Sequence, residues 1–320
     1  MARTDREDVK TLSIVTPCYN EVENLRELHA RITAAMAQLS GYDYEIIVVD
    51  NASTDGSVEL LRELCAADKH LKAIVNNRNF GHIRSPYHGM LQASGACIIY
   101  LASDLQDPPE MIPEFVRLWE EGNEVVLAQK TNTSEAFTFK MVRHAYYHLI
   151  GRLSDVELVK NATGFGLYDR RVIDAIRDIG DPYPYFRGLI CELGYKRALV
   201  PFTQPQRKRG FTKNNFYTLY DNAMLGITSH SKIPLRLATL TGFVLGAISF
   251  VIAAAYLVYK LLYWKSFELG LAPVLIGIFF FGAVQLFFTG IIGEYLGAIH
   301  THILNHPPVI ERERINFPKK

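Results

Sequence analysis

Three short segments of this chain combine carboxylate, amide and hydroxyl side chains that suit a phosphorylated ligand. They are TPCYNE (16–21), DNASTDG (50–56) and DLQDPPE (104–110). Each follows a short apolar run, namely LSIVT (12–16), EIIVV (45–49) and CIIYL (97–101). A single Asp in such a place is usually a turn or capping residue. Three such segments together predict a nucleotide site, with carboxylates near the diphosphate for a divalent ion.

The pattern around these segments predicts an α/β fold. Apolar runs typical of buried strands occur at 12–16, 45–49, 73–75, 97–101 and 124–128. Stretches with helical spacing lie between them, at about 25–39, 58–64, 82–92 and 109–121. Such alternation favours a mostly parallel sheet covered by helices on both faces. Ligands of these sheets bind at the carboxyl ends of the strands, which is where the three polar segments fall.

Two long uncharged stretches predict membrane helices near the C-terminus. Leu237–Tyr259 has no charged residue over 23 positions, and Leu269–Gly293 has none over 25. About 20 apolar residues are enough for a helix to cross a bilayer. The alternative is a buried helical hairpin of a soluble protein, but two adjacent uncharged runs of this length are rare in soluble folds.

Lysine and arginine predict the orientation of this helix pair. The flanks carry Arg207, Lys208, Arg209, Lys213, Lys232 and Arg236 before the first stretch, and Arg312, Arg314, Lys319 and Lys320 after the second. The turn between them has only Lys260 and Lys265. The more basic side faces the cytoplasm. We therefore expect a multi-pass protein of the cytoplasmic (inner) membrane, with a cytoplasmic catalytic domain at 1–232, a two-helix anchor at 233–297 and a cytoplasmic tail at 298–320.

Composition argues against several other classes of protein. The formal net charge is +1, so no overall field favours nucleic acid. The four cysteines form no CxxC pair and no zinc-like cluster, which is typical of reduced thiols in a cytoplasmic domain. The N-terminal MARTDREDVK lacks the apolar core of a secretory signal.

Several motifs carry a family resemblance: TPCYNE (16–21), VDNASTDGS (49–57), NFGH (79–82), SDLQDPPE (103–110), TGFGLYDRR (163–171), YFRGL (185–189), RKRGFTK (207–213) and GIIGEYLG (290–297). With them the chain resembles glycosyltransferase family 2, which has the Rossmann-like GT-A fold. It is most similar to polyprenyl-phosphate glycosyltransferases with two C-terminal membrane helices, such as undecaprenyl-phosphate glucosyl- and aminoarabinosyltransferases and dolichol-phosphate mannosyltransferases. The resemblance implies transfer of a sugar, from UDP-glucose or a related UDP-sugar, to polyprenyl (undecaprenyl) phosphate. It also implies a homo-oligomer, a tetramer in related proteins.

The resemblance also implies roles for individual residues. The nucleotide would be held by Pro17, Tyr19, Glu21, Asp50 and Ser53. Asp104 and Gln106 would lie at the diphosphate and at a bound Mg²⁺ or Mn²⁺. Phosphate groups would meet Arg207, Thr212 and Lys213, which match the R-x-x-G-x-S/T-K segment. Asp104, Gln106, Arg207 and Lys213 would then form the catalytic group. The basic cluster at 207–213 has a second interpretation, a patch that binds anionic lipid.

Three positions depart from the pattern of that family. Ala102 replaces the first Asp of the usual DxD, and Asn51 and Ala52 replace Asp and Gly of the usual DDGS. Gly164 stands where an Asp often precedes Phe165, which removes a candidate general base. A phosphate monoester needs no base, because its second pKa is about 6 and it is largely a dianion at neutral pH. Two alternatives stay open: a synthase that extends a glycan, and an inactive membrane scaffold.

Overall fold

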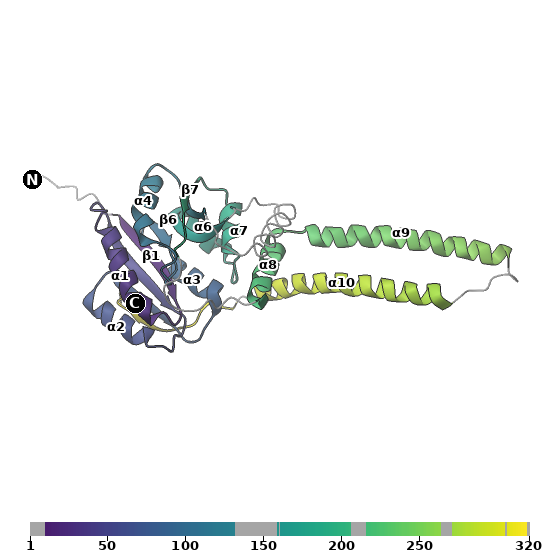
Figure 1. The fold of residues 1–320 in the computed structure, drawn as a ribbon, viewed down its shortest axis with the longest axis horizontal. Helices are drawn as coiled ribbons and strands as arrows, with labels where there is room; N and C mark the ends of the chain where they lie inside the picture. The colour runs from purple at the N-terminus through teal and green to yellow at the C-terminus, as the bar shows by residue number, and fades with distance from the viewer. Residues whose placement is uncertain are drawn as a thin grey trace, which may run out of the picture.

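The computed structural model describes residues 10–131, 159, 161–205, 216–263, 271–304 and 306–318. Its described part consists of an α/β layer structure and two long helices that extend from it side by side (Figure 1). A single eight-stranded sheet, in the order β7-β5-β6-β4-β1-β2-β3-β8, forms the centre of the α/β part.

The strands of this sheet are β1 (Thr11–Cys18), β2 (Asp43–Asp50), β3 (Leu71–Asn76), β4 (Cys97–Tyr100), β5 (Val125–Lys130), β6 (Ala162–Asp169), β7 (Arg197–Phe202) and β8 (Glu311–Ile315). The four neighbours β4, β1, β2 and β3 are parallel, as predicted. The sheet as a whole is mixed, because β6 runs antiparallel to β4 and β5, and β8 runs antiparallel to β3. Strand β7 pairs with β5 in parallel.

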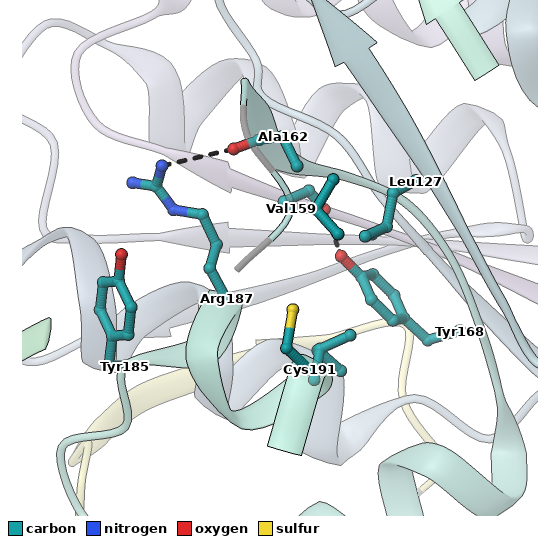
Figure 2. Close-up of a pocket in the computed structure, with 9 residues that line it drawn as sticks. Leu127, Val159, Ala162, Tyr168, Tyr185, Arg187 and Cys191 are labelled. Carbon is teal, nitrogen blue, oxygen red and sulfur yellow. Dashed lines mark hydrogen bonds between the residues drawn. The ribbon is translucent and has the colours of Figure 1, made fainter. Parts of the chain in front are cut away.

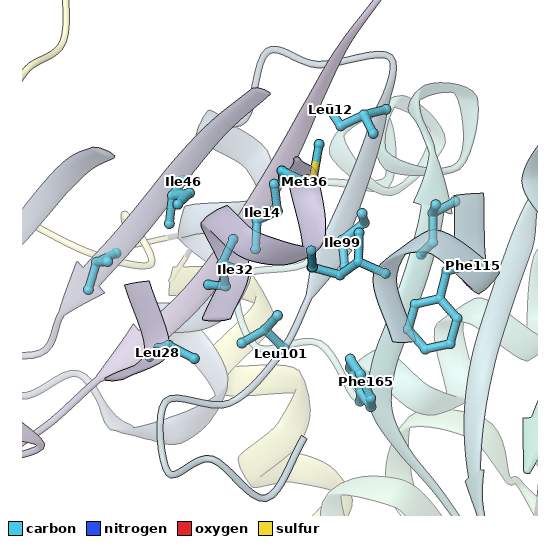
Figure 3. Close-up of a cluster of buried hydrophobic side chains, with 14 of the residues drawn as sticks. Leu12, Ile14, Leu28, Ile32, Met36, Ile46, Ile99, Leu101, Phe115 and Phe165 are labelled. Carbon is cyan, nitrogen blue, oxygen red and sulfur yellow. The ribbon is translucent and has the colours of Figure 1, made fainter. Parts of the chain in front are cut away.

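Helices cover both faces of the sheet. They are α1 (Val22–Met36), α2 (Ser57–Ala67), α3 (Gly81–Gln92), α4 (Ile112–Glu120), α6 (Arg170–Ile179) and α7 (Phe186–Glu192), with a short 3-10 turn η1 (Pro109–Met111) before α4. Side chains of β1 alternate between two cores, so that Leu12 and Ile14 pack with α1 while Val15 packs with α3. Figure 3 shows the first core, in which Ile32 of α1 and Phe115 of α4 lie over the strands. Burial of both faces explains why these strands read as continuous apolar runs.

The two long helices are α9 (Ile233–Leu262) and α10 (Leu271–Leu304), preceded by α8 (Phe216–His230). Two helical stretches among the described residues are strongly apolar: Ile233–Leu262 has a mean hydropathy of 2.1 and Ile276–Leu304 one of 2.0. No residue in the apolar part of either stretch is buried. Apolar surface of this extent is not left open to water by soluble proteins. Both helices are long and apolar enough to span a membrane.

The chain returns to the sheet after α10. Strand β8 pairs with β3, although 298–320 was predicted to be a tail. Side-chain contacts hold this strand to the helices, since Glu311 Oε1 lies 2.6 Å from His88 Nε2 on α3 and Glu313 Oε2 lies 2.7 Å from Arg62 Nη2 on α2. The sequence ERERI has the charges typical of an edge strand, which limit pairing with other chains. Because of these charges, β8 is not an apolar run, and the sequence pattern did not predict it as a strand.

Candidate active site

A cleft of about 400 Å³ opens at the carboxyl ends of β1, β2 and β4, next to the start of α3. This volume is in the range of small-ligand sites, about 300–1,000 Å³. Its walls are formed by Pro17, Cys18, Tyr19, Glu21, Asn51, Asn79, Gly81, His82, Ser85, Pro86, Tyr100, Ala102, Ser103 and Asp104. The three polar segments predicted to share one edge of the sheet therefore do so.

The loops after β1 and β2 are tied together by reciprocal hydrogen bonds. Asn20 N donates to Ser53 Oγ at 2.9 Å, and Thr54 N donates to Asn20 Oδ1 at 2.8 Å. Asn20 has φ 57°, a left-handed conformation that asparagine tolerates better than most residues. Ser53 thus holds the loop in place and is absent from the residues that line the cleft.

Asp50, at the end of β2, stands behind the wall of the cleft. Its side chain is fully buried, and its Oδ1 accepts a hydrogen bond from Ser53 N at 3.0 Å. Burial raises the pKa of Asp50 above its ordinary value. Within the described residues its Oδ2 has no hydrogen-bond partner. A buried acceptor without a partner is rare, and a donor group of a ligand would complete it.

Asn51 organises the opposite wall through its side-chain amide. Its Nδ2 donates to Asn79 Oδ1 at 2.8 Å and to the Gly81 carbonyl at 3.2 Å. Its Oδ1 accepts from Phe80 N at 2.9 Å and from Asn76 Nδ2 at 3.1 Å. An Asp at position 51 could still accept the bonds from Phe80 N and Asn76 Nδ2. It could not donate the bonds to Asn79 and Gly81. The departure from the usual Asp is therefore matched by the local structure of the 79–82 segment.

Two carboxyl groups lie in the loop after β4. Asp104 lines the cleft, and its Oδ1 accepts from Gln106 N at 3.1 Å. Asp107 is buried behind it, and its Oδ2 accepts from Ala102 N at 3.0 Å. Burial, with a contribution from Asp104, raises the pKa of Asp107 to about 7. The described residues contain no cluster of three or more His, Cys, Asp or Glu side chains that could hold a metal ion. A cation at Asp104 would therefore need the phosphates of a substrate as ligands.

The predicted site residues divide into three groups. Those that line the cleft are Pro17, Tyr19, Glu21 and Asp104. Those beside or behind it are Asp50, Ser53 and Gln106, whose Nε2 donates to the Pro205 carbonyl at 3.4 Å. Arg207, Thr212 and Lys213 lie outside the described residues. The prediction missed Asn51, Asn79, His82 and Ser85 as wall residues, although the NFGH segment could have indicated two of them.

The cleft-bearing part is joined closely to the long helices. Helix α7 contacts the end of α8, where His230 Nδ1 lies 3.2 Å from Glu192 Oε2. A Cβ atom at Gly188 would lie only 2.2 Å from His230 Nε2, so a glycine is needed for this contact. Tyr295 of α10 donates a hydrogen bond to the Ser231 carbonyl at 2.7 Å.

The chain is similar to several known proteins. The profile of the family described as glycosyl transferase family 2 matches residues 13–177. An uncharacterized glycosyltransferase of Synechocystis is 34% identical over 297 residues, covering 92% of this chain and 93% of that protein. A prophage-derived bactoprenol glucosyl transferase of Shigella flexneri is 29% identical, covering 93% and 96%. The mannosyltransferase PcManGT of Pyrobaculum calidifontis, solved with GDP-Man and Mn²⁺, is 15% identical with a TM-score of 0.42, covering 92% and 86%.

Proposed function

This chain belongs to glycosyl transferase family 2 and is a glycosyltransferase, and we propose that it transfers a sugar from a nucleotide-sugar to polyprenyl phosphate at a membrane surface. The donor we propose is UDP-glucose or a related UDP-sugar, and the acceptor is undecaprenyl phosphate. Support comes from several relatives named bactoprenol glucosyl transferase, which match this chain over nearly its whole length. The product would be a polyprenyl-phosphate-sugar used in modifying cell-envelope glycans.

The observation that carries this proposal is the double attachment of the cleft-bearing sheet to the two apolar helices. One attachment is the contact of Gly188 with His230, three residues before α9 begins. The other is β8, which enters the sheet shortly after α10 ends. If α9 and α10 span a bilayer, both attachments favour a position of the cleft close to its surface. An acceptor whose phosphate lies at the level of the lipid headgroups suits this arrangement.

The chemistry we propose asks little of the protein beyond positioning and charge. An oxygen of the acceptor phosphate forms a bond to the anomeric carbon of the sugar as the bond to the donor diphosphate breaks. The electron pair of that bond leaves with the nucleoside diphosphate. The acceptor is largely a dianion at neutral pH, so no proton has to be removed and the absence of an Asp at Gly164 is tolerated. Holding the two reactants in line is then the main contribution to rate.

A divalent cation fits the donor set at Asp104. A carboxylate oxygen is a hard ligand, Asp104 lines the cleft, and Mg²⁺ commonly takes one or two carboxylates together with substrate phosphates. When bound, Mg²⁺ or Mn²⁺ would stabilise negative charge on the departing diphosphate. Gln106 is a weaker candidate, because its amide nitrogen is directed to Pro205. Arg207, Thr212 and Lys213 remain proposed phosphate contacts.

The proposal includes the arrangement predicted from the sequence. Residues 1–232 would form a cytoplasmic catalytic domain, 233–297 the membrane anchor, and 298–320 a second cytoplasmic segment. This last segment contains β8, which joins the sheet. We also propose that the protein is a homo-oligomer in the inner membrane.

A donor screen tests this function. The purified protein is incubated with undecaprenyl phosphate and one nucleotide-sugar at a time, and the lipid is analysed by mass spectrometry. We expect one UDP-hexose to give a lipid heavier by one hexose. Undecaprenol, which lacks the phosphate, is the matched control and should give no product. The proposal fails if no donor modifies the lipid, and failure accompanied by sugar addition to a glycan would favour the synthase.

A further inference from the structure

A second, smaller cavity lies on the side of the sheet next to α7. It has a volume of about 20 Å³, room for about one water molecule, and its lining includes Gly164, Tyr168, Tyr185, Arg187 and Cys191. Figure 2 shows Arg187 and Tyr185 rising side by side from the start of α7, with the hydroxyl of Tyr168 on the other side of the cavity. Tyr168 OH donates to the Gly164 carbonyl at 2.6 Å.

Arg187 has few partners for a guanidinium group. Its Nη1 donates to the Ala162 carbonyl at 3.3 Å, and within the described residues it makes no ion pair. Several other arginines of the α/β part are paired, for example Arg31 with Glu110 at 2.7 Å and Arg62 with Glu313 at 2.7 Å. A guanidinium has five N–H donors, so most of those on Arg187 are left for solvent or a ligand.

Gly164 lines the same cavity as Arg187 and brings no side chain to it. Gly164 has φ +93°, a conformation that favours glycine, and a Cβ there would lie 3.9 Å from Tyr100 Cε1. Tyr100 lines the main cleft together with Asp104. Burial raises the pKa of Tyr100, the charges of Asp107 and Asp104 add to that rise, and the positive charge of Arg187 opposes it. Gly164 thus connects the small cavity, which Arg187 also lines, with Tyr100 of the main cleft.

Arg84 adds a second positive charge near the loop that precedes α7. It lies on α3, with its Cζ 5.4 Å from the ring of Tyr183 in the loop before α7. Its Nε is buried and has no hydrogen-bond partner within the described residues. Helix α7 also carries Gly188, the residue that contacts His230 just before α9. Arg187 is thus next in sequence to the residue that contacts the segment before α9.

From this geometry we infer that Arg187 binds the phosphate of the lipid acceptor and holds it for attack on the donor sugar. The inference rests on the proposed function, since it presupposes a phosphate monoester as acceptor. Guanidinium groups bind phosphate oxygens through paired, charge-assisted hydrogen bonds. Arg187 takes no proton and forms no covalent bond, so its effect is on affinity and orientation. The donor, bound on the side of Pro17 and Tyr19, should be affected much less.

The test compares Arg187→Gln with Arg197→Gln, a matched change at an exposed arginine of β7. Initial rates of sugar transfer are measured in detergent while undecaprenyl phosphate and UDP-hexose are varied separately. We expect Arg187→Gln to raise the apparent KM for the lipid phosphate about 10–100-fold, the loss typical of one charge-assisted contact. The KM for the donor should change by less than about threefold. Arg197→Gln should behave as wild type.

Two further readings separate ligand binding from a structural role. Inorganic phosphate should compete with the lipid in the wild type and lose that effect in Arg187→Gln, while Arg187→Lys should recover part of the lipid affinity because the charge is kept. An unchanged KM for the lipid in Arg187→Gln would overturn the inference and leave the proposed function standing. Equal losses for donor and lipid with a lower melting temperature would also overturn it, as a structural effect. A wild-type protein that transfers no sugar to lipid would remove the proposed function and this inference with it.

Discussion

Asn51 Nδ2 and Asn79 Oδ1 lie 2.8 Å apart and join two loops that are 28 residues apart in the chain. The same Asn79 oxygen accepts a hydrogen bond from Gly81 N at 2.8 Å. This fixes the orientation of the Asn79 amide, because turning it over would bring its NH₂ group against Gly81 N. A side chain that can donate is therefore required at position 51.

Asn51→Asp should weaken binding of the donor. A carboxylate would face Asn79 Oδ1 and the Gly81 carbonyl, and two acceptors held together in a partly buried place cost about 1–3 kcal/mol. We expect the donor KM to rise roughly five- to hundredfold, measured by transfer kinetics or calorimetry with UDP. Asn77→Asp, at an exposed position of the neighbouring turn, is the control and should change little.

Ala52→Gly should stabilise the protein. Ala52 has φ 62°, and the left-handed conformation costs a residue with a Cβ about 1–2 kcal/mol. Part of this gain is offset by the greater freedom of glycine in the unfolded chain. We expect a net increase of about 0.5–1 kcal/mol in the free energy of unfolding, seen as a higher melting temperature in detergent. Ala66→Gly, at an exposed position in the last turn of α2, should instead lower the free energy of unfolding, by up to about 1 kcal/mol. A lower melting temperature for Ala52→Gly would contradict the assignment of strain.

Glu45 predicts a pH dependence of stability. It is buried in β2, where its Oε2 accepts from Lys72 Nζ at 2.6 Å and its Oε1 accepts from Ser13 Oγ at 2.6 Å and Ser94 N at 2.7 Å. Burial alone would raise its pKa, but these hydrogen bonds outweigh burial and hold the pKa of Glu45 below its ordinary value of 4.5. A lowered pKa gives stability that is present above pH 4.5 and is lost as the pH falls through the lower, folded value.

Glu45→Gln should therefore cost more at pH 7 than at pH 4. At pH 7 we expect a loss of about 1–3 kcal/mol in the free energy of unfolding, because Lys72 loses its charged partner. Below pH 4.5 the difference from the wild type should shrink. Thermal unfolding at both pH values gives the comparison, with Glu59→Gln on the exposed face of α2 as control. A difference that did not change with pH would argue against ionised Glu45.

Asp104→Asn should lower transfer about 10–100-fold without unfolding the protein, since a loop carboxylate contributes little to the core. Activity should disappear in excess chelator and return with Mg²⁺ or Mn²⁺. Asp178→Asn, at an exposed position near the end of α6, is the control. Full activity in chelator would refute the metal requirement. Full activity of Asp104→Asn would instead direct attention to Asp107.

The protein should stay in the membrane pellet after washing with carbonate or high salt. Peripheral proteins held by charge are released by such treatment, whereas a pair of spanning helices is not. Immunoblotting of the pellet and supernatant is sufficient. Appearance of the chain in the supernatant would mean that α9 and α10 do not span the bilayer.

Local patterns were enough to predict five of the eight strands of the sheet. The strands β1 to β5 and the helices between them follow from apolar runs and turn residues, and their observed ends lie within a few positions of the predicted ones. The strand β6 contains Gly164 and Gly166, which weaken its pattern. The pairing of β8 with β3 depends on residues more than 230 positions apart, and no local pattern carries that information.

The location of the candidate site could be predicted from the sequence, but the hydrogen bonds within it could not. The ends of parallel strands converge by topology, which placed Pro17, Tyr19 and Asp104 around one cleft. The sequence showed Asn51 only as a departure from the usual Asp. Its function as the donor to Asn79 depends on a distance between two loops, and only the folded structure supplies that distance.

The return of the chain to β3 has a consequence for biosynthesis. Strand β8 is made after both long helices, so the edge of β3 that it covers stays unpaired until those helices have been translated. In a bilayer, β8 can reach β3 only when α9 and α10 have crossed in opposite directions. A chain with one helix left uninserted would have Glu311–Ile315 on the far side of the membrane and an open sheet edge on the near side. Completion of the sheet would therefore distinguish correctly inserted molecules from misinserted ones, which would be exposed to aggregation and proteolysis.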